Sequence, residues 1–184
     1  MSTTRKFPDM FVDPEDDPRE ANAVSQGDER ATLLEFLRYQ RLTMELKCSD
    51  LDAEQLAHRS VEPSSMSLLG LVRHMAEVER SWFRRRMAQQ DVPRRFCTEE
   101  NRDGDWDDAV ADPAVVEEAW KAWREECAFT DGFIAETDDL GFTVTYDRGT
   151  ISLRELLCHM IEEYARHNGH ADLLRERIDG RTGE

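Results

Sequence analysis

A chain of 184 residues is long enough for one domain with a single hydrophobic core. Its 40 acidic side chains oppose 24 basic ones, and the resulting net charge of -16 disfavours binding to the phosphate backbone of nucleic acids. No run of apolar residues approaches the length of a membrane-spanning helix, so the sequence also disfavours a membrane protein.

Residues 1–26 have the composition of an acidic tail. Residues 9–20 combine many acidic side chains with Pro14 and Pro18, and such a composition disfavours a packed core. We therefore predict a flexible tail over residues 1–26 and one domain over residues 27–184.

The four cysteines indicate a reducing compartment. Cys48, Cys97, Cys127 and Cys158 are far apart and form no C-x-x-C motif, which disfavours a disulfide framework or a cysteine zinc site. The first 20 residues also lack the basic and apolar regions of a secretory signal. We expect reduced thiols and a cytoplasmic protein.

Four long helical patterns follow, each with apolar residues that recur every three or four positions. They cover residues 28–48, 67–89, 112–134 and 152–178. We expect a short helix or turn over 51–57 and a long connection over 91–111. An extended segment is expected over 141–150, where apolar side chains alternate with threonines. These lengths predict an all-α fold, a four-helix bundle with a short extended segment before the last helix.

The ends of the helical patterns carry recognisable signals. Ser67 and Asp112–Pro113 are typical of helix starts, because the side-chain oxygen can accept from the first free N–H groups. Ser152 with Glu155 three positions later is a capping box, and Gly180 suits the end of the last helix.

The last helical pattern holds two Glu-x-x-x-His pairs, Glu155/His159 and Glu163/His167. Residues four positions apart share a helix face and can bind one ion together. At about 100° per residue, His167 falls inside the apolar stripe and Glu163 at its edge, whereas Glu155 and His159 point toward water. The sequence therefore predicts Glu163 and His167 as the inward pair, with His170 as a reserve ligand.

The second helical pattern supplies one more candidate ligand, His74, at the edge of its apolar stripe. His74, Glu163 and His167 would give two imidazoles and a carboxylate, and three protein ligands leave coordination positions open for a substrate. The residues leave another interpretation open, in which His74 is a hydrogen-bonded core residue and the Glu/His pair is an ordinary helix pair. Periodicity alone does not establish that the two helices touch here.

Two long segments, SLLGLVRHMAEVERSWF (67–83) and TISLRELLCHMIEEYARHNGHADLLRERIDG (150–180), resemble the DinB-like superfamily, in particular an actinobacterial branch. The resemblance covers most of the chain after residue 28. It implies an up-down-down-up four-helix bundle with one metal ion, held by a histidine on the second helix and an H-x-x-x-H pair on the last. His74 and His167 match, whereas Glu163 replaces the first histidine of the pair.

A related group, the mycothiol-dependent maleylpyruvate isomerases, is similar in having Glu-x-x-x-His at this place. Zinc is the first choice for the divalent metal, with nickel, manganese or iron as alternatives. The resemblance also implies a homodimer.

The resemblance implies a metal-dependent S-transferase that joins a low-molecular-weight thiol such as mycothiol to an electrophilic small molecule. The metal would lower the pKa of the thiol, and His170 would orient a ligand or relay a proton. Two alternatives remain: a hydrolase that uses a metal-bound water, and a non-enzymatic stress-related binding protein.

A cluster of arginines at 80–95 raises the separate question of nucleic-acid binding. Arg84–Arg86 end the second helix, where cations interact favourably with the helix dipole, so a solvated helix end is the preferred interpretation. Some of these arginines could instead hold an anionic thiol cofactor. Trp106, in the long connection, is a candidate for the mouth of the pocket.

Overall fold

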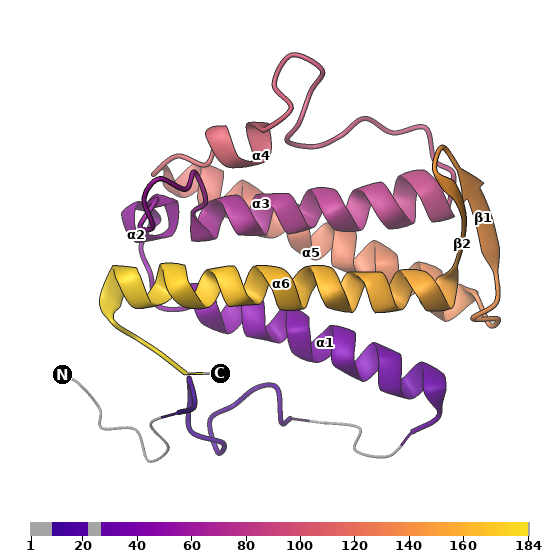
Figure 1. The fold of residues 1–184 in the computed structure, drawn as a ribbon, viewed down its shortest axis with the longest axis horizontal. Helices are drawn as coiled ribbons and strands as arrows, with labels where there is room; N and C mark the ends of the chain where they lie inside the picture. Colours follow the sequence, from indigo (N-terminus) through magenta and orange to yellow (C-terminus); the bar gives the residue numbers. More distant parts are fainter. Residues whose placement is uncertain (1–8, 22–26, 184) are drawn as a thin grey trace.

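The computed structural model describes residues 9–21 and 27–183, and this part of the chain is mostly helical (Figure 1). Its elements are, in chain order, α1 (Glu29–Cys48), α2 (Ala53–Ala57), α3 (Leu68–Glu79), the π-helix η1 (Arg80–Met87), α4 (Gly104–Asp107), α5 (Pro113–Glu136), β1 (Thr143–Tyr146), β2 (Gly149–Ser152) and α6 (Leu153–Asp179). None of the described helices is both long enough and apolar enough to cross a membrane.

The helix starts lie where the sequence predicts them. The side chains of Asp28, Ser67, Asp112 and Ser152 each accept a hydrogen bond from a backbone N–H in the first turn of the helix that follows. Gly180 ends α6 with φ 77°, a left-handed conformation that glycine adopts without steric cost.

The second helical pattern differs from the expectation in its winding. Residues 67–89 are predicted as one α-helix, whereas the chain changes from α3 to the π-helix η1 at Arg80. Apolar spacings near four residues fit both windings, so the sequence does not separate them. The wider π-helical turn sets the directions in which Trp82 and Arg86 project, and π-helical turns are frequent at functional sites.

The four long helical segments run side by side (Figure 1). The helix α1 packs on α6, α3 packs on α5, and α3 meets α6 along a narrower seam. Along the sequence colours of Figure 1, α1 and α6 run in one direction and α3 and α5 in the other. The seam between α3 and α6 is the part of the fold that matters for the candidate site.

A small antiparallel hairpin, β1–β2, joins α5 to α6 at one end of the helices. Val144 pairs with Ile151, and both side chains are buried against the helices. The segment 141–150, predicted to be extended, therefore contains all of β1, the turn and the first two residues of β2, and the second arm runs on to Ser152.

The described part of the acidic tail packs on the helices, in contrast to the weak order expected for residues 1–26. The ring of Phe11 is fully buried, with Nζ of Lys47 4.3 Å and the guanidinium carbon of Arg181 3.9 Å from its centroid. Arg19 is buried and forms an ion pair with Asp17. Its guanidinium also donates to the side-chain hydroxyl of Thr43 on α1. Residues 1–8 and 22–26 lie outside the described residues.

A polar network lies inside the helices around Glu79, which is fully buried. Its carboxylate accepts hydrogen bonds from Tyr164 at 2.8 Å and from Thr130 at 2.6 Å, and it forms an ion pair with Arg41 at 2.7 Å. Burial alone would lower the pKa of Arg41, but the charge of Glu79 raises it well above its usual value. This network ties α1, α3, α5 and α6 together.

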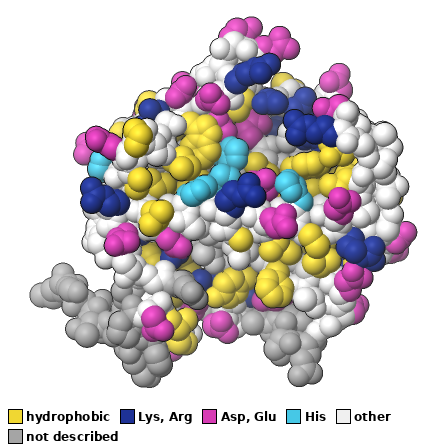
Figure 2. Space-filling view, in the orientation of Figure 1, with side chains coloured by type: hydrophobic (Ala, Val, Ile, Leu, Met, Phe, Trp, Pro, Cys, Tyr) yellow, Lys and Arg dark blue, Asp and Glu magenta, His cyan; other side chains and the backbone are white. Residues whose placement is uncertain are grey.

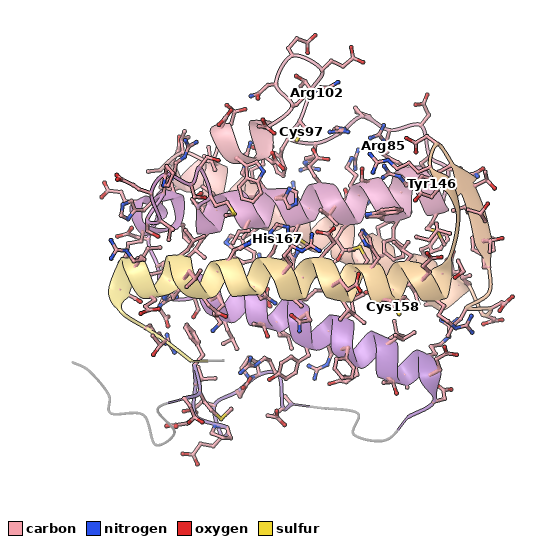
Figure 3. The ribbon with its side chains drawn as sticks, viewed as in Figure 1. Arg85, Cys97, Arg102, Tyr146, Cys158 and His167 are labelled. Carbon is pink, nitrogen blue, oxygen red and sulfur yellow. The ribbon has the colours of Figure 1, made fainter. Side chains whose placement is uncertain are left out.

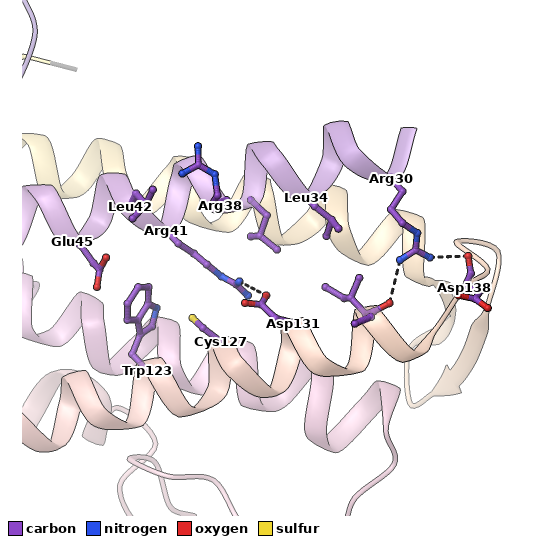
Figure 4. Close-up of a pocket in the computed structure, with 13 residues that line it drawn as sticks. Arg30, Leu34, Arg38, Arg41, Leu42, Glu45, Trp123, Cys127, Asp131 and Asp138 are labelled. Atoms are coloured by element: carbon purple, nitrogen blue, oxygen red, sulfur yellow. Dashed lines mark hydrogen bonds and ion pairs between the residues drawn. The ribbon is translucent and has the colours of Figure 1, made fainter. Parts of the chain in front are cut away.

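A cavity of about 580 Å³ opens between α1 and α5, beside this network (Figure 4). Trp123, Cys127 and Arg41 line its inner side, and Arg41 pairs there with Asp131 at 2.7 Å. None of its lining residues belongs to the predicted metal triad. This cavity is therefore separate from the candidate site.

Candidate metal centre

The seam between α3 and α6 brings together the three residues that the sequence singles out. His74 comes from α3, and Glu163 and His167 come from successive turns of α6. One ligand atom from each residue lies within 4.8 Å of the other two, and the rings of His74 and His167 are 4.7 Å apart. Histidine side chains reach the surface in this region (Figure 2), so the site is open to solvent on one side.

His74 is oriented by Asp105, a residue that the sequence analysis did not single out. Nδ1 of His74 lies 2.8 Å from Oδ2 of Asp105, and Asp105 is 4% exposed. A carboxylate can only accept, so Nδ1 carries the proton and the lone pair of Nε2 is left free. This is the arrangement that fixes the tautomer of a metal-binding histidine.

Asp105 is itself held in place by α3. Arg73, which is buried, donates to the backbone carbonyls of Asp105 at 3.0 Å and Gly104 at 2.9 Å, and its guanidinium stacks on Phe96. A Cβ at Gly104 would lie 2.3 Å from the carbonyl oxygen of Phe96, so the turn requires glycine. The helix α4 is thereby fixed against α3 with Asp105 directed at His74.

Glu163 lies between two histidines of its own helix. Oε2 lies 3.6 Å from Nε2 of His167, and Oε1 lies 3.5 Å from Nε2 of His159. The prediction that His159 points toward water holds in part: its side chain is 33% exposed, but its ring also packs on Trp82, with centroids 4.9 Å apart. Trp82 belongs to η1, and a helical wheel drawn for α6 does not include contacts from another helix.

The His167 imidazole is held neutral in the absence of metal. Burial, with further contributions from His74, His170 and Arg166, lowers the pKa of His167 to about 4. Its Nδ1 lies 3.4 Å from Nδ1 of His170. His170 therefore lies beside the triad and contacts one of its members, and it is not itself part of the cluster of ligand atoms.

Trp106 covers one side of the site. Its ring stacks on His74 with centroids 4.9 Å apart and lies 6.4 Å from His167. It approaches α3 closely because position 70 is glycine: a Cβ there would lie 2.7 Å from Cε3 of Trp106. The expectation that Trp106 lies at the mouth of the pocket agrees with this contact.

The sequence carries only a weak signal for Asp105. It is one of four aspartates between residues 103 and 108, and spacing does not distinguish it from the others. The Gly-Asp-Trp order is informative only once the structure shows why position 104 needs glycine and where Trp106 packs.

The donor set suits a divalent transition metal. It offers two imidazole nitrogens and a carboxylate oxygen, with His74 held in the tautomer that presents Nε2. Among the described residues Glu163 has no lysine or arginine partner, so its negative charge is left for a cation. The residues present therefore fit one metal ion with positions open for other ligands.

A histidine from one helix and a Glu-x-x-x-His pair from another define a helical protein with a candidate three-ligand metal centre. A family model described as "Mycothiol-S-transferase" matches residues 32–180. Because this match covers most of the chain, the protein belongs to that DinB-like family.

A solved structure supports the fold. The crystal structure of a conserved protein from Enterococcus faecalis is similar with a TM-score of 0.57 and 15% sequence identity, over 81% of this chain and 96% of that one. At this identity the likeness concerns the fold alone. No curated protein matches the sequence.

Proposed function

We propose that this protein is a metal-dependent S-transferase that joins a mycothiol-type thiol to an electrophilic small molecule. Membership of the mycothiol S-transferase family supports the reaction class. The single observation that carries the proposal is the convergence of His74, Glu163 and His167, with ligand atoms within 4.8 Å of one another. Zinc remains the first choice of metal, with nickel, manganese or iron as alternatives.

The transfer breaks the S–H bond of the thiol and forms a bond from sulfur to the electrophilic atom of the substrate. The thiol proton goes to the group that sulfur displaces or, where sulfur adds to a double bond, to the neighbouring atom of that bond. The thiolate is the reactive form, and a free thiol is mostly protonated at neutral pH. A divalent metal in the triad supplies a Lewis acid that lowers the pKa of the thiol. The triad leaves positions open for this because three side chains converge in the part of the chain that the structure describes.

The chain's own residues supply orientation. Asp105 holds His74 in one tautomer, and His159 lies against the outer oxygen of Glu163. We assign His170 an orienting role, because its Nδ1 lies 3.4 Å from Nδ1 of His167. The ring of Trp106 shields His74 from water, which strengthens electrostatic interactions inside the site.

The test is metal content by elemental mass spectrometry, together with thiol-dependent turnover over a panel of electrophiles. The wild type should carry about one ion per chain, and His74→Ala, Glu163→Ala and His167→Ala should each lose it while remaining folded. Since loss of a residue that only orients a ligand costs about 10–100-fold in affinity, loss of a ligand should cost more than ~100-fold.

Two matched controls sharpen this test. His58→Ala and Glu162→Ala remove exposed residues of the same types and should leave metal content and turnover unchanged. Metal-loaded protein without thiol-dependent turnover across the panel would exclude the transferase. Turnover of an ester without any thiol would instead favour the hydrolase.

The topology of the bundle, the oligomeric state and the cellular location are also proposals. The opposite directions of α1/α6 and α3/α5 in Figure 1 support an up-down-down-up DinB-like bundle. We further propose a cytoplasmic location, from the pattern of the cysteines, and a homodimer, on the resemblance alone. Light scattering coupled to size-exclusion chromatography tests the dimer, which would give twice the chain mass of 21.4 kDa.

A further inference from the structure

A second cavity, of about 680 Å³, lies beside the connection between η1 and α4. Its lining residues are Arg85, Pro93, Arg94, Cys97, Thr98, Glu99 and Arg102. Figure 3 shows Arg85, Cys97 and Arg102 on the side of α3 away from His167. This pocket is therefore separate from the candidate metal centre.

The arginines near this pocket fall into two groups. Arg80 and Arg84 both pair with the buried Glu126, at 2.8 Å and 2.5 Å, and Arg95 pairs with Glu125 at 3.1 Å. The guanidinium of Arg86 stacks on the ring of Trp82. These four side chains are already used to hold η1 and the connection in place.

The second group has no partner. Among the described residues, the side chains of Arg85, Arg94 and Arg102 make no hydrogen bond or ion pair, although the chain carries 40 acidic residues and a net charge of -16. All three line the same cavity, opposed only by Glu99. A local excess of positive charge in a strongly acidic protein indicates attraction of an anion.

The wall of the pocket is fixed before any ligand arrives. Oε1 of Glu77, which is buried, accepts from the backbone N–H groups of Arg95 at 2.5 Å, of Phe96, and of Cys97 at 3.1 Å. Arg73 holds the other end of the segment by stacking on Phe96. Such a wall loses little conformational entropy on binding, which favours affinity.

We propose that this pocket binds a small organic anion carrying at least two negative charges. Guanidinium groups bind carboxylate and phosphate groups through paired hydrogen bonds, and three of them suit a ligand with more than one such group. A volume of about 680 Å³ is in the range of small-molecule sites and exceeds the needs of a lone inorganic ion.

Cys97 and Thr98, which also line this pocket, favour binding over chemistry. Burial, together with the charge of Asp105, raises the pKa of Cys97, so its side chain is a neutral thiol. The hydroxyl of Thr98 accepts from the N–H of Asn101 at 2.9 Å and keeps its own proton for a ligand. The proposal goes beyond the S-transferase and does not depend on the metal.

The experiment is isothermal titration of the purified full chain with citrate and with glycerol 3-phosphate, in about 150 mM NaCl to suppress diffuse attraction. Saturable binding of either compound is expected, and the compound that binds tells carboxylates from phosphates. Arg94→Gln and Arg102→Gln should each weaken binding about tenfold or more. Glu99→Gln should strengthen it, because it removes the opposing charge.

Arg148→Gln is the matched control, since Arg148 is exposed, has no partner among the described residues and lies on the hairpin. It should leave binding unchanged, and thermal melting should show that all variants remain folded. Equal weakening by Arg148→Gln, or no saturable binding of either anion, would overturn the proposal. Binding should persist in His74→Ala, so failure of the metal centre and failure of this pocket are distinguishable.

Discussion

Two carboxylates inside this protein have opposite surroundings, and the contrast separates structure from function. Glu79 on α3 is fully buried, and Arg41, Thr130 and Tyr164 direct hydrogen-bond donors at its oxygens. A buried charge that is paired and fully hydrogen-bonded has no capacity left for a ligand. Glu79 therefore serves to join four helices.

Glu163 on α6 has imidazoles as its only ion-pair partners among the described residues. Its oxygens face His159 and His167, and His74 completes the cluster. Imidazole nitrogens and a carboxylate can all offer lone pairs, and lone pairs that converge attract a metal ion. The difference shows that the partners of a polar side chain, more than its burial, decide what it does.

The largest expected effect comes from replacing Glu79 and Glu163 in turn and comparing the losses of stability. Glu79→Ala should destabilise the protein by about 3–5 kcal/mol, because the buried Arg41 would lose its buried partner and keep only the exposed Asp131. Glu163→Ala should change stability by about 1 kcal/mol or less, since it breaks no pair with lysine or arginine. Urea denaturation of the metal-free proteins measures both.

If Glu79→Ala is too unstable to purify, the more conservative Glu79→Gln takes its place. The folded fraction of Glu79→Gln should retain the metal. Equal losses of stability in the two alanine variants would contradict the assignment of a structural role to Glu79 and a metal-binding role to Glu163. So would loss of the metal from folded Glu79→Gln.

A smaller effect, on metal affinity, is expected when the residue that orients His74 is replaced. Asp105→Asn should weaken metal affinity about 10–100-fold, because the amide can donate to Nδ1 and favour the wrong tautomer of His74. Competition with a chromophoric chelator measures the affinity. Asp103→Asn, an exposed neighbour, should have no such effect, and a wild-type affinity in Asp105→Asn would show that Asp105 only shapes the turn.

The pH dependence of stability sharpens the comparison further. The unfolded chain protonates His167 near its ordinary pKa of 6.5, whereas the folded, metal-free protein does so only at about 4. The unfolded state therefore binds more protons between these values, and stability falls as pH is lowered through this window.

His167→Gln should flatten this part of the pH profile. Urea denaturation with chelator at about pH 7 and about pH 4.5 measures the slope, and the window follows from the lowered pKa. The exposed His58→Gln is the control and should keep the wild-type slope. An unchanged slope in His167→Gln would mean that other groups dominate this pH range.

The smallest expected effect comes from disturbing the packing of Trp106 over the site. Gly70→Ala places a methyl group where the ring of Trp106 now lies, so the ring should shift and tryptophan fluorescence and turnover should change. Gly132→Ala on α5 meets open space and should only stabilise the helix, by about 0.5–1 kcal/mol. Identical fluorescence in both variants would show that Trp106 does not depend on Gly70.

The sequence by itself determined the helices and the identity of the three candidate ligands. Asp28, Asp112 and Ser152 cap helices in the structure because capping depends on residues within one turn of each other. The Glu163/His167 pair could be predicted from the sequence for the same reason, since two side chains four residues apart lie on one face of a helix.

Only the tertiary structure decided which distant residues meet. Asp105 reaches His74 across 31 positions, and Trp82 of η1 packs on the ring of His159 of α6. The burial of Phe11 in the acidic tail is of the same kind, because it depends on contacts with Lys47 and Arg181. Local periodicity carries the information for a turn or a helix face, whereas the partners of a side chain across elements depend on how the elements pack.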